Sequence, residues 1–363
     1  MARPFKTYPL LLPFACLYGL GVRVRTALFD SGRWPERRFS LPLIGVGNLA
    51  VGGTGKTPHT EYLVRLLSPR WRTAVLSRGY GRRTRGFRLV ATDDAAADVG
   101  DEPLQMKRHF PAVTVAVDAD RCEGIDNLLD RGAEAPQVIV LDDVYQHRHV
   151  RPGLNILLTD YSRLYVDDCL LPAGRLREPA AASHRADVVI VTKCPPGLTA
   201  ESRADVERRL GLASKQRLFF STLGYMPPSP LDEGSRPSGS ISLDGRHVLL
   251  VAGIARPQPL IDELQRRGAA VTPLLFADHH VFTPRDVRRI AAAYDRLPRE
   301  SRLIVTTEKD AARLSPRVMP DAHLRAATWV QPVGIRFVDG KERQFNQLII
   351  DYVSRNSANS PMD

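Results

Sequence analysis

A glycine-rich stretch at residues 43–60, LIGVGNLAVGGTGKTPHT, has the residue types and the order of a phosphate-binding loop. An apolar run precedes five glycines within eleven positions, and a Lys-Thr pair and a helical pattern follow them. Backbone N–H groups of such a loop can turn inward around phosphate oxygens, and the helix N-terminus adds partial positive charge. The residues that we expect at the phosphates are Gly52, Gly53, Thr54, Gly55, Lys56 and Thr57.

Two residues of this loop carry the specific chemistry. Lys56 can reach the outer phosphates, and the hydroxyl of Thr57 can bind Mg²⁺. Ala50 stands where the strict pattern has glycine, so the loop is a variant. The alternative is a glycine-rich turn with an exposed lysine, but the apolar run before the loop and the helical pattern after it favour the phosphate loop.

Two carboxylates follow the apolar run 138–141 directly. A carboxylate at a strand end beside a phosphate loop holds Mg²⁺, either directly or through water. We therefore expect Asp142 to serve the metal, with Asp143 in support. The alternative is a pair of acids that opens a turn.

Three further segments carry polar residues of the types that bind phosphorylated substrates. Residues 77–83 form a glycine-hinged, arginine-rich loop, which either binds a substrate phosphate or is a solvated basic turn. Residues 144–148 continue the carboxylate segment, and residues 171–179 place charged side chains between proline and glycine breakers. The candidate substrate-binding residues are Arg78, Tyr80, His147, Arg177 and Glu178.

The tetrapeptide Gly100-Asp101-Glu102-Pro103 places two acids before a predicted helix. Asp101 can be the N-cap of that helix. It can also be a base that accepts a hydroxyl proton in a nucleotide cleft. The residues alone favour the N-cap.

The elements that must position these residues alternate between strand-like and helix-like patterns from residue 39 to about residue 192. Such alternation predicts a mainly parallel sheet covered by helices, with ligands at the carboxyl ends of its strands. The expected strands are 41–46, 73–77, 113–117, 138–141, 154–159 and 188–192, and the expected helices are 57–67, 103–109 and 121–131.

A Pro/Ser/Gly-rich stretch, 227–240, marks a linker, after which the α/β pattern resumes. We therefore expect a P-loop nucleotide- and substrate-binding domain at 39–226 and a second α/β domain at 241–357 that closes over the nucleotide cleft. Its strands are predicted at 247–252, 271–276 and 303–306, and its helices at 257–267, 284–297 and 341–355. Asp278, His279 and His280 have the types for proton handling, although such histidines are more often on the surface. Residues 306–310 have the pattern of a helix cap.

Residues 1–38 combine an apolar run, 8–22, with basic residues on both sides. The run is shorter than a spanning helix needs, and no small-residue cleavage site follows it. A helix lying on an anionic membrane surface fits better. The alternative is a helix packed against the protein's own core.

The length and composition are those of a soluble globular protein of about two domains. Its 51 basic and 40 acidic residues give a net charge of +11, which favours an anionic partner such as a membrane surface, a phosphorylated substrate or nucleic acid. The 4 cysteines are scattered, which supports neither a disulfide framework nor a zinc site and fits a reducing compartment.

Taken in order, GNLAVGGTGKTP, SRGYGR, GDEP, LDDVYQHR, GRLREP, GIARP, ADHH and TEKDA resemble the motifs of the tetraacyldisaccharide 4′-kinase (lipid A 4′-kinase) family over essentially the whole chain. Two departures are Val144-Tyr145, where the family has Gly-Phe, and Ala277, where it has Pro. Neither departure removes a titratable group. The resemblance implies a P-loop NTPase-type α/β fold with a second, smaller α/β domain and an N-terminal membrane-associating helix.

The resemblance also implies an activity: transfer of the γ-phosphoryl group of ATP, with Mg²⁺, to the 4′-hydroxyl of a tetraacylated glucosamine disaccharide 1-phosphate. It implies Asp101 as the catalytic base, tuned by His279, and Lys56 as a catalytic cation. The expected location is the cytoplasmic face of the inner membrane, and we expect a monomer. A regulatory P-loop NTPase is the rival interpretation. Nucleic-acid binding rests on charge alone, because only Tyr80 and Phe87 are aromatic residues interleaved in the basic loops.

Overall fold

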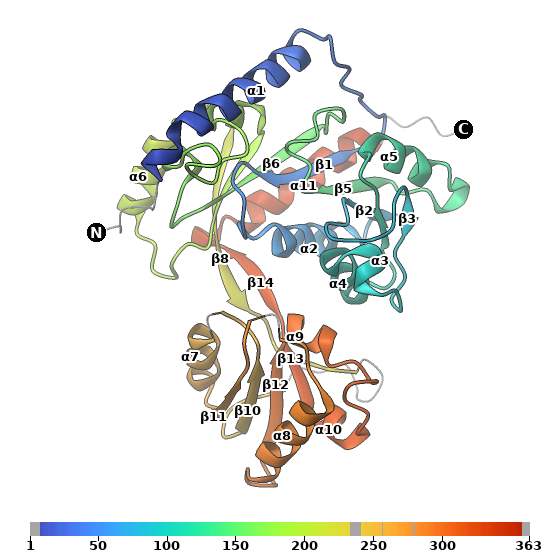
Figure 1. Cartoon of the computed structure of the whole chain (residues 1–363), viewed down its shortest axis with the longest axis vertical. Helices are drawn as coiled ribbons and strands as arrows, with labels where there is room; N and C mark the ends of the chain where they lie inside the picture. The colour runs from blue at the N-terminus through green and yellow to red at the C-terminus, as the bar shows by residue number, and fades with distance from the viewer. Residues whose placement is uncertain (1–7, 233–240, 256, 279, 358–363) are drawn as a thin grey trace. The chain divides into compact units, whose positions relative to one another are not determined.

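The computed structural model describes residues 8–232, 241–255, 257–278 and 280–357. The chain divides into two compact units (Figure 1). Unit 1 runs to Leu223 and resumes at Ile335, and unit 2 comprises Gly224–Gly334.

A nine-stranded sheet forms the centre of unit 1, in the order β14-β8-β7-β6-β1-β5-β2-β4-β3. The pairs from β8 to β4 are parallel, and β3 is antiparallel to β4. Its central strands are fully buried, because helices and loops cover both faces of a parallel sheet, and they therefore appear in the sequence as apolar runs. The strands are β1 (Leu43–Asn48), β2 (Thr73–Ser77), β3 (Arg88–Leu89), β4 (Thr114–Val117), β5 (Val138–Asp142), β6 (Leu154–Asp160), β7 (Val188–Thr192), β8 (Arg217–Tyr225) and β14 (Val333–Phe337).

Strand β1 lies between β5 and β6 at the point where the strand order reverses. The chain first builds β2, β4 and β5 on one side of β1 and then β6, β7 and β8 on the other. A parallel sheet opens a crevice at the carboxyl ends of its strands at such a point. The glycine-rich loop follows β1 and therefore lies at this crevice.

Helices on one face of the sheet are α2 (Lys56–Leu67), α4 (Asp101–His109) and α11 (Glu342–Ser357), which pack against β1, β5, β2 and β4. The other face is covered by α5 (Arg121–Leu129), α6 (Ala200–Leu210) and the long loops after β5 and β6. The short α3 (Ala96–Val99) precedes α4. The predicted strands and helices of this region are therefore confirmed, with ends that differ by a few residues.

The C-terminal helix corrects the predicted domain boundary. The prediction assigned 241–357 to the second domain, but the chain from Ile335 onward belongs to unit 1. Phe345, Ile349 and Val353 are buried on α11 and join the core that contains β1 and α2. Their apolar spacing predicts a helix, but only the packing shows which core the helix completes.

Two glycines of the predicted phosphate loop have a different role. Gly45 and Gly47 lie inside β1, and a Cβ at Gly47 would stand 2.6 Å from the Cβ of Tyr145. The loop after β5 therefore crosses directly over β1 and could not approach as closely over larger residues. This crossing brings residues 144–148 beside the crevice.

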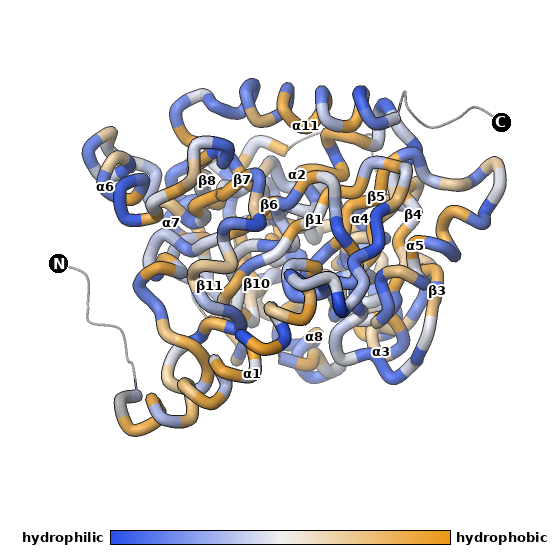
Figure 2. The backbone as a smooth tube through the Cα atoms, turned by 90° about the horizontal axis from the view of Figure 1, so that it is seen from above, coloured by the Kyte–Doolittle hydropathy of each residue, from blue (hydrophilic) through white to orange (hydrophobic). Residues whose placement is uncertain are grey.

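Helix α1 (Leu12–Asp30) has 19 residues, and by length and composition alone it could cross a membrane. The predicted apolar run underestimated its length. Ala15 and Gly19 face the protein, and a Cβ at Gly19 would stand 2.8 Å from Leu170 Cδ1. Much of the rest of its apolar surface is exposed, and Figure 2 shows hydrophobic segments along it.

Unit 2 contains a five-stranded sheet in the order β11-β10-β12-β13-β9, parallel except for β9. Helix α7 covers one face, and α8 and α10 cover the other. The elements are β9 (Ser229–Pro230), β10 (His247–Ala252), α7 (Gln258–Arg266), β11 (Ala270–Leu275), α8 (Pro284–Asp295), β12 (Arg302–Thr307), α9 (Glu308–Arg313), α10 (Ala322–Ala326) and β13 (Thr328–Gln331). The predicted second α/β fold is confirmed. Part of the predicted linker, 233–240, lies outside the described residues.

Candidate active site

The phosphate loop leaves β1 as an extended segment and then turns sharply. Val51 N–H donates to Arg175 O at 2.8 Å, and Ala50 pairs with Leu176 in an antiparallel bridge. The following glycines, Gly52 and Gly55, have φ of 106° and 87°. Ala50 is tolerated in place of glycine because it lies in the extended part and needs no positive φ.

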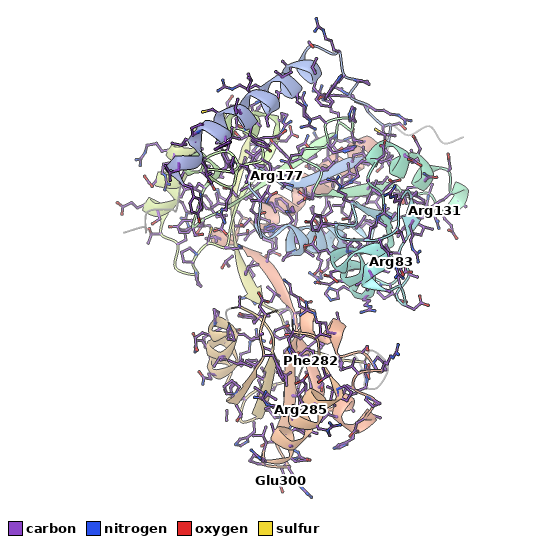
Figure 3. The ribbon with its side chains drawn as sticks, in the orientation of Figure 1. Arg83, Arg131, Arg177, Phe282, Arg285 and Glu300 are labelled. Carbon is purple, nitrogen blue, oxygen red and sulfur yellow. The ribbon has the colours of Figure 1, made fainter. Side chains whose placement is uncertain are left out.

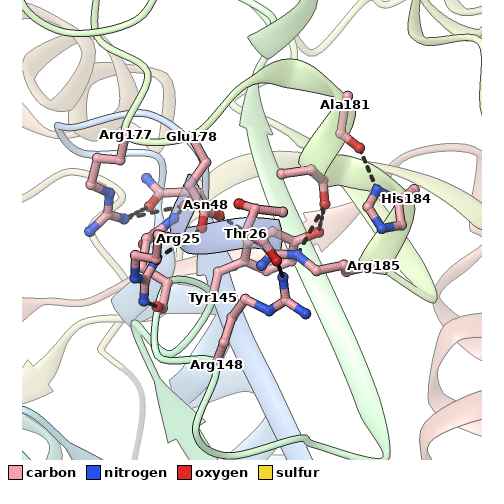
Figure 4. A network of polar contacts seen from close by, with 12 residues as sticks. Arg25, Thr26, Asn48, Tyr145, Arg148, Arg177, Glu178, Ala181, His184 and Arg185 are labelled. Carbon is pink, nitrogen blue, oxygen red and sulfur yellow. Dashed lines mark hydrogen bonds and ion pairs between the residues drawn. The ribbon is translucent and has the colours of Figure 1, made fainter. Parts of the chain in front are cut away.

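The side chain of Lys56 lies close to the carboxylate of Asp143 and the amide of Asn48, at the ends of β5 and β1. Lys56 Nζ lies 3.8 Å from Asp143 Oδ1 and 3.5 Å from Asn48 Oδ1. Arg177 donates to both carboxylate oxygens of Asp143, at 2.9 and 3.3 Å. It also donates to Asn48 Oδ1 (Figure 4), and Figure 3 shows where Arg177 lies in unit 1. Burial opposes ionisation of Asp143, but the hydrogen bond from Arg177 and the charge of Lys56 outweigh it and lower the pKa of Asp143. Asp143 is therefore an anion held between two cations.

The pKa of Asp142 is shifted in the opposite direction to that of Asp143. It is 5% exposed and accepts hydrogen bonds from Thr60 Oγ1 and Ser77 Oγ, both at 3.3 Å. Burial, and then the negative charges of Glu102 and Asp143, raise the pKa of Asp142 to about 6. The charges of Lys56 and Arg121 act in the opposite direction but do not outweigh burial and the two acids.

The acidic tetrapeptide 100–103 affects the charge at Asp142 through Glu102, which the sequence analysis did not select. Gly100 occupies the N-cap position of α4, and Asp101 is the first helical residue. The N-cap interpretation of Asp101 is thus wrong. The N-cap is Gly100, whose positive φ of 94° favours glycine at that position. Glu102, and not Asp101, is the acid of this pair whose charge acts on Asp142. Asp101 is exposed.

The residue types around Asp142 suit a magnesium ion. Mg²⁺ prefers oxygen ligands, and Asp142 and Asp143 supply carboxylates while Thr57 lies in the first turn of α2. Burial is the largest cause of the raised pKa of Asp142, and the repulsion from Glu102 and Asp143 that adds to it is one that a divalent cation would relieve. The predicted metal residues are therefore of the types that bind the ion, and Glu102, whose negative charge acts on Asp142, is a further candidate.

A cavity of about 720 Å³ lies beside Asp143 and is rich in cationic side chains. The predicted residues Arg78, His147, Arg177 and Glu178 line it together with Tyr18, Arg25, Arg121 and Gln146. Burial, and then the positive charge of Arg121, lower the pKa of His147 to about 4. His147 Nε2 and Gln146 Oε1 are buried without a hydrogen-bond partner among the described residues, so a bound polar molecule could satisfy them.

Some predicted site residues are placed differently. Tyr80 is 91% exposed and does not line the cavity. Glu178 lines it, but its carboxylate is engaged by Arg25 and Arg185 (Figure 4). His279 lies outside the described residues. In unit 2, His280 Nε2 lies 3.1 Å from Asp286 Oδ2, and Thr307 caps α9 as predicted.

Sequence reasoning missed three residues of this site. Asn48 is fully buried and donates to Thr54 Oγ1 at 2.7 Å, which joins the strand end to the loop. Arg121 is 1% exposed and donates to Asp142 O at 3.2 Å. Glu102 directly follows Asp101, the residue that the sequence analysis considered as N-cap or base. Asn48 is the last residue of β1, directly before the loop, and only this position in the sequence could have indicated its role. Arg121 begins α5 and has no such signal in the sequence.

A parallel α/β sheet with a glycine loop, a lysine and two carboxylates at its central strand ends defines a P-loop nucleotide-binding protein. The model of the LpxK family, tetraacyldisaccharide-1-P 4′-kinase, matches residues 7–354. The chain therefore belongs to the tetraacyldisaccharide 4′-kinase family and is a kinase.

Individual relatives agree with this assignment. A tetraacyldisaccharide 4′-kinase from Parabacteroides distasonis is 48% identical over 362 residues, covering 98% of each chain. Another from Phocaeicola vulgatus is 46% identical over 352 residues, covering 96% of each chain. A structure of LpxK from Aquifex aeolicus in complex with ATP is similar with a TM-score of 0.71 at 28% identity, covering 94% of this chain and 98% of that one. The regulatory NTPase alternative is not favoured.

The state of Asp142 predicts a pH-dependent gain of stability in Asp142→Asn. Because its pKa is raised to about 6 in the folded protein, the wild type loses stability as pH rises through that value. The neutral variant escapes this loss, so it should be more stable than the wild type by about 1–3 kcal/mol at pH 7.5, and by much less near pH 4. Denaturant unfolding without divalent cations measures the difference.

The exposed carboxylate Asp93 provides the control, since Asp93→Asn should change little between the two pH values. Adding Mg²⁺ should reduce the difference in unfolding free energy between Asp142→Asn and the wild type, because the ion should stabilise only the wild type. An Asp142→Asn protein that is less stable than the wild type at pH 7.5 would contradict the assignment.

Proposed function

We propose that the protein transfers the γ-phosphoryl group of ATP to the 4′-hydroxyl of a tetraacylated glucosamine disaccharide 1-phosphate, an intermediate of lipid A biosynthesis. Family membership supports the reaction class. The observation that carries the proposal is the position of Asp143, which contacts Lys56 of the phosphate loop and Arg177 of the cationic cavity. The phosphates of a nucleotide and an anionic acceptor would thus meet at one carboxylate.

The nucleotide side of the reaction rests on the loop. The relative from Aquifex aeolicus binds ATP, which supports ATP as the donor here. Thr57, Asp142 and Glu102 would hold Mg²⁺, with Asp143 in support, and the ion would neutralise charge on the phosphates. Lys56 donates to the transferring group, where charge develops in the transition state. Residues Gly52 to Gly55 cradle the remaining phosphates.

The acceptor side rests on the cavity. Its arginines, Arg25, Arg78 and Arg177, suit a phosphorylated sugar, because guanidinium groups bind phosphate oxygens in pairs. His147 and Gln146 offer buried polar atoms to sugar hydroxyls. Tyr18 and Arg25 come from α1, so the helix with the exposed apolar surface also forms one wall of the cavity. A lipid acceptor can therefore keep its acyl chains beside α1 while its sugars enter the cavity.

Proton removal from the acceptor hydroxyl requires a base, and we assign it to Asp101. Asp101 is exposed at the start of α4, one residue from Glu102, and so is free to meet an acceptor. Arg177 and Lys56 already engage Asp143, which makes that carboxylate a weaker candidate. The tuning role of His279 stays a sequence-based prediction.

Helix α1 would lie on the cytoplasmic surface of the inner membrane. Leu17 and Leu20 are 68% and 59% exposed, whereas the Tyr18 hydroxyl donates to Arg177 O at 2.8 Å. The polar contacts hold the helix against unit 1, which favours a helix that lies on the membrane over one that leaves the protein to span it.

The central experiment measures phosphoryl transfer from radiolabelled ATP with and without the disaccharide acceptor. Transfer should require the acceptor, and Lys56→Ala should lower kcat by roughly 10²–10³-fold because a transition-state cation is lost. Lys215→Ala, at an exposed lysine of unit 1, is the matched control. Near-normal turnover in Lys56→Ala, or equal ATP consumption without acceptor, would exclude the proposed reaction.

A second experiment separates the two acids of the tetrapeptide. Asp101→Asn should lower kcat by roughly 10²–10⁴-fold while ATP binding and thermal stability stay unchanged. Glu102→Gln should instead raise the Mg²⁺ concentration needed for half-maximal activity, because it removes a metal ligand. Full activity in Asp101→Asn would transfer the base assignment to Asp143.

A third experiment concerns the membrane. The double variant Leu17→Asp/Leu20→Asp should bind phosphatidylglycerol vesicles less tightly than the wild type in a sedimentation assay, because charged groups replace apolar contacts with lipid. Val281→Asp changes an equally exposed apolar residue of unit 2, 77% exposed, and should leave binding intact. Unchanged sedimentation of the folded double variant would remove α1 from the membrane contact.

A further inference from the structure

Side chains hold the phosphate loop by three consecutive carbonyl oxygens. Lys193 Nζ donates to Gly53 O, Thr192 Oγ1 donates to Thr54 O at 2.8 Å, and His59 Nδ1 lies 2.7 Å from Gly55 O. Thr192 and His59 are 1% and 3% exposed. The three donors come from the end of β7 and the first turn of α2.

These contacts determine which way the loop's peptide groups point. The C=O and N–H of one trans peptide unit point in opposite directions. Holding the oxygens of Thr54 and Gly55 against Thr192 and His59 therefore turns the N–H groups of Gly55 and Lys56 to the other side, where phosphate would lie. A glycine-rich loop without such contacts can turn its carbonyls toward the phosphates, which would repel them.

Lys193 has a backbone conformation that is uncommon for its residue type. Its φ is 56°, and such strain is found mainly where the surrounding structure requires it. Asp160 Oδ2 accepts from Lys193 Nζ at 2.8 Å. Burial acts to raise the pKa of Asp160, but hydrogen bonds from Lys193 and Ser162 lower it overall. The lysine is thus held by an ionised carboxylate in reach of the loop.

His59 is held on both sides of its ring. A carbonyl oxygen can only accept, so Nδ1 carries the proton that is donated to Gly55 O. Burial lowers the pKa of His59 to about 4, so the ring is neutral near pH 7 and Nε2 accepts from Ser221 Oγ at 2.9 Å. Ser221 lies on β8 and is 1% exposed. The imidazole therefore connects the loop to a buried strand in a single tautomer.

We propose that Lys193, Thr192 and His59 form a carbonyl brace that holds the phosphate loop in its binding conformation before ATP arrives. They are positioning residues, since they contact the loop from outside and not the phosphates. The proposal deepens the proposed function and rests on it in one respect, that the loop binds ATP. Ordering the loop in advance lowers the entropy lost on binding, so the brace should act on ATP and not on the acceptor.

The decisive variant is Lys193→Met, because this side chain is 36% exposed and is therefore the least buried of the three donors. Hydrogen exchange of the amides of residues 52–57 should become faster in the protein without nucleotide. The KM for ATP should rise about 10-fold or more, as expected for a lost hydrogen bond from a charged group, while the KM for the acceptor stays constant. Lys193→Arg should restore both values, and Lys215→Met should have neither effect.

Thr192→Val and His59→Phe extend the test to the other two carbonyls. Each should accelerate loop exchange and raise the KM for ATP in the same direction, and Thr192→Ser should restore function. If His59→Phe does not fold, the lysine and threonine variants still decide the proposal.

The brace is overturned if Lys193→Met leaves loop exchange and the KM for ATP unchanged. It is also overturned if the KM values for ATP and acceptor rise together with a lower melting temperature, because that result indicates general destabilisation. Failure of the proposed function has a different signature: Lys56→Ala would then bind ATP like the wild type. The loop-exchange measurement without nucleotide still tests the brace in that event.

Discussion

The carboxylate of Asp143 lies between Lys56 and Arg177, and most of the site depends on this arrangement. Two cations neutralise one partly buried anion, so the phosphate loop and the cavity loop are drawn to the same strand end. Asn48 completes the contact, since its side chain binds both the loop and Arg177. A nucleotide and a substrate that share this edge of the sheet would therefore share its charges.

The neighbouring carboxylate shows how the same edge can serve a metal. Asp142 is buried, and its ionised form is disfavoured by burial and by two adjacent acids. Such a group is costly in the absence of a cation and well matched to one in its presence. Function and stability therefore oppose each other at this residue.

The N-terminal helix connects the site to the exposed apolar surface. Tyr18 and Arg25 reach the cavity, while neighbouring positions on α1 expose leucines. Both sets belong to one helix, and Leu17 belongs to both, since it is exposed and also lines the cavity. A lipid substrate needs this combination, because its acyl chains and its phosphorylated sugars require different surroundings.

The sequence by itself determined the local elements: the β1–loop–α2 unit, the buried strands and the acids at their ends. Parallel strands covered on both faces must be apolar throughout, and a phosphate loop needs its glycines and lysine in order, so both leave signals in short segments. Only the tertiary structure decided that the charge of Glu102 acts on Asp142, that α11 completes unit 1 and that Lys193 reaches Gly53. These facts depend on segments far apart in the chain, whose contacts arise from packing and leave no local pattern.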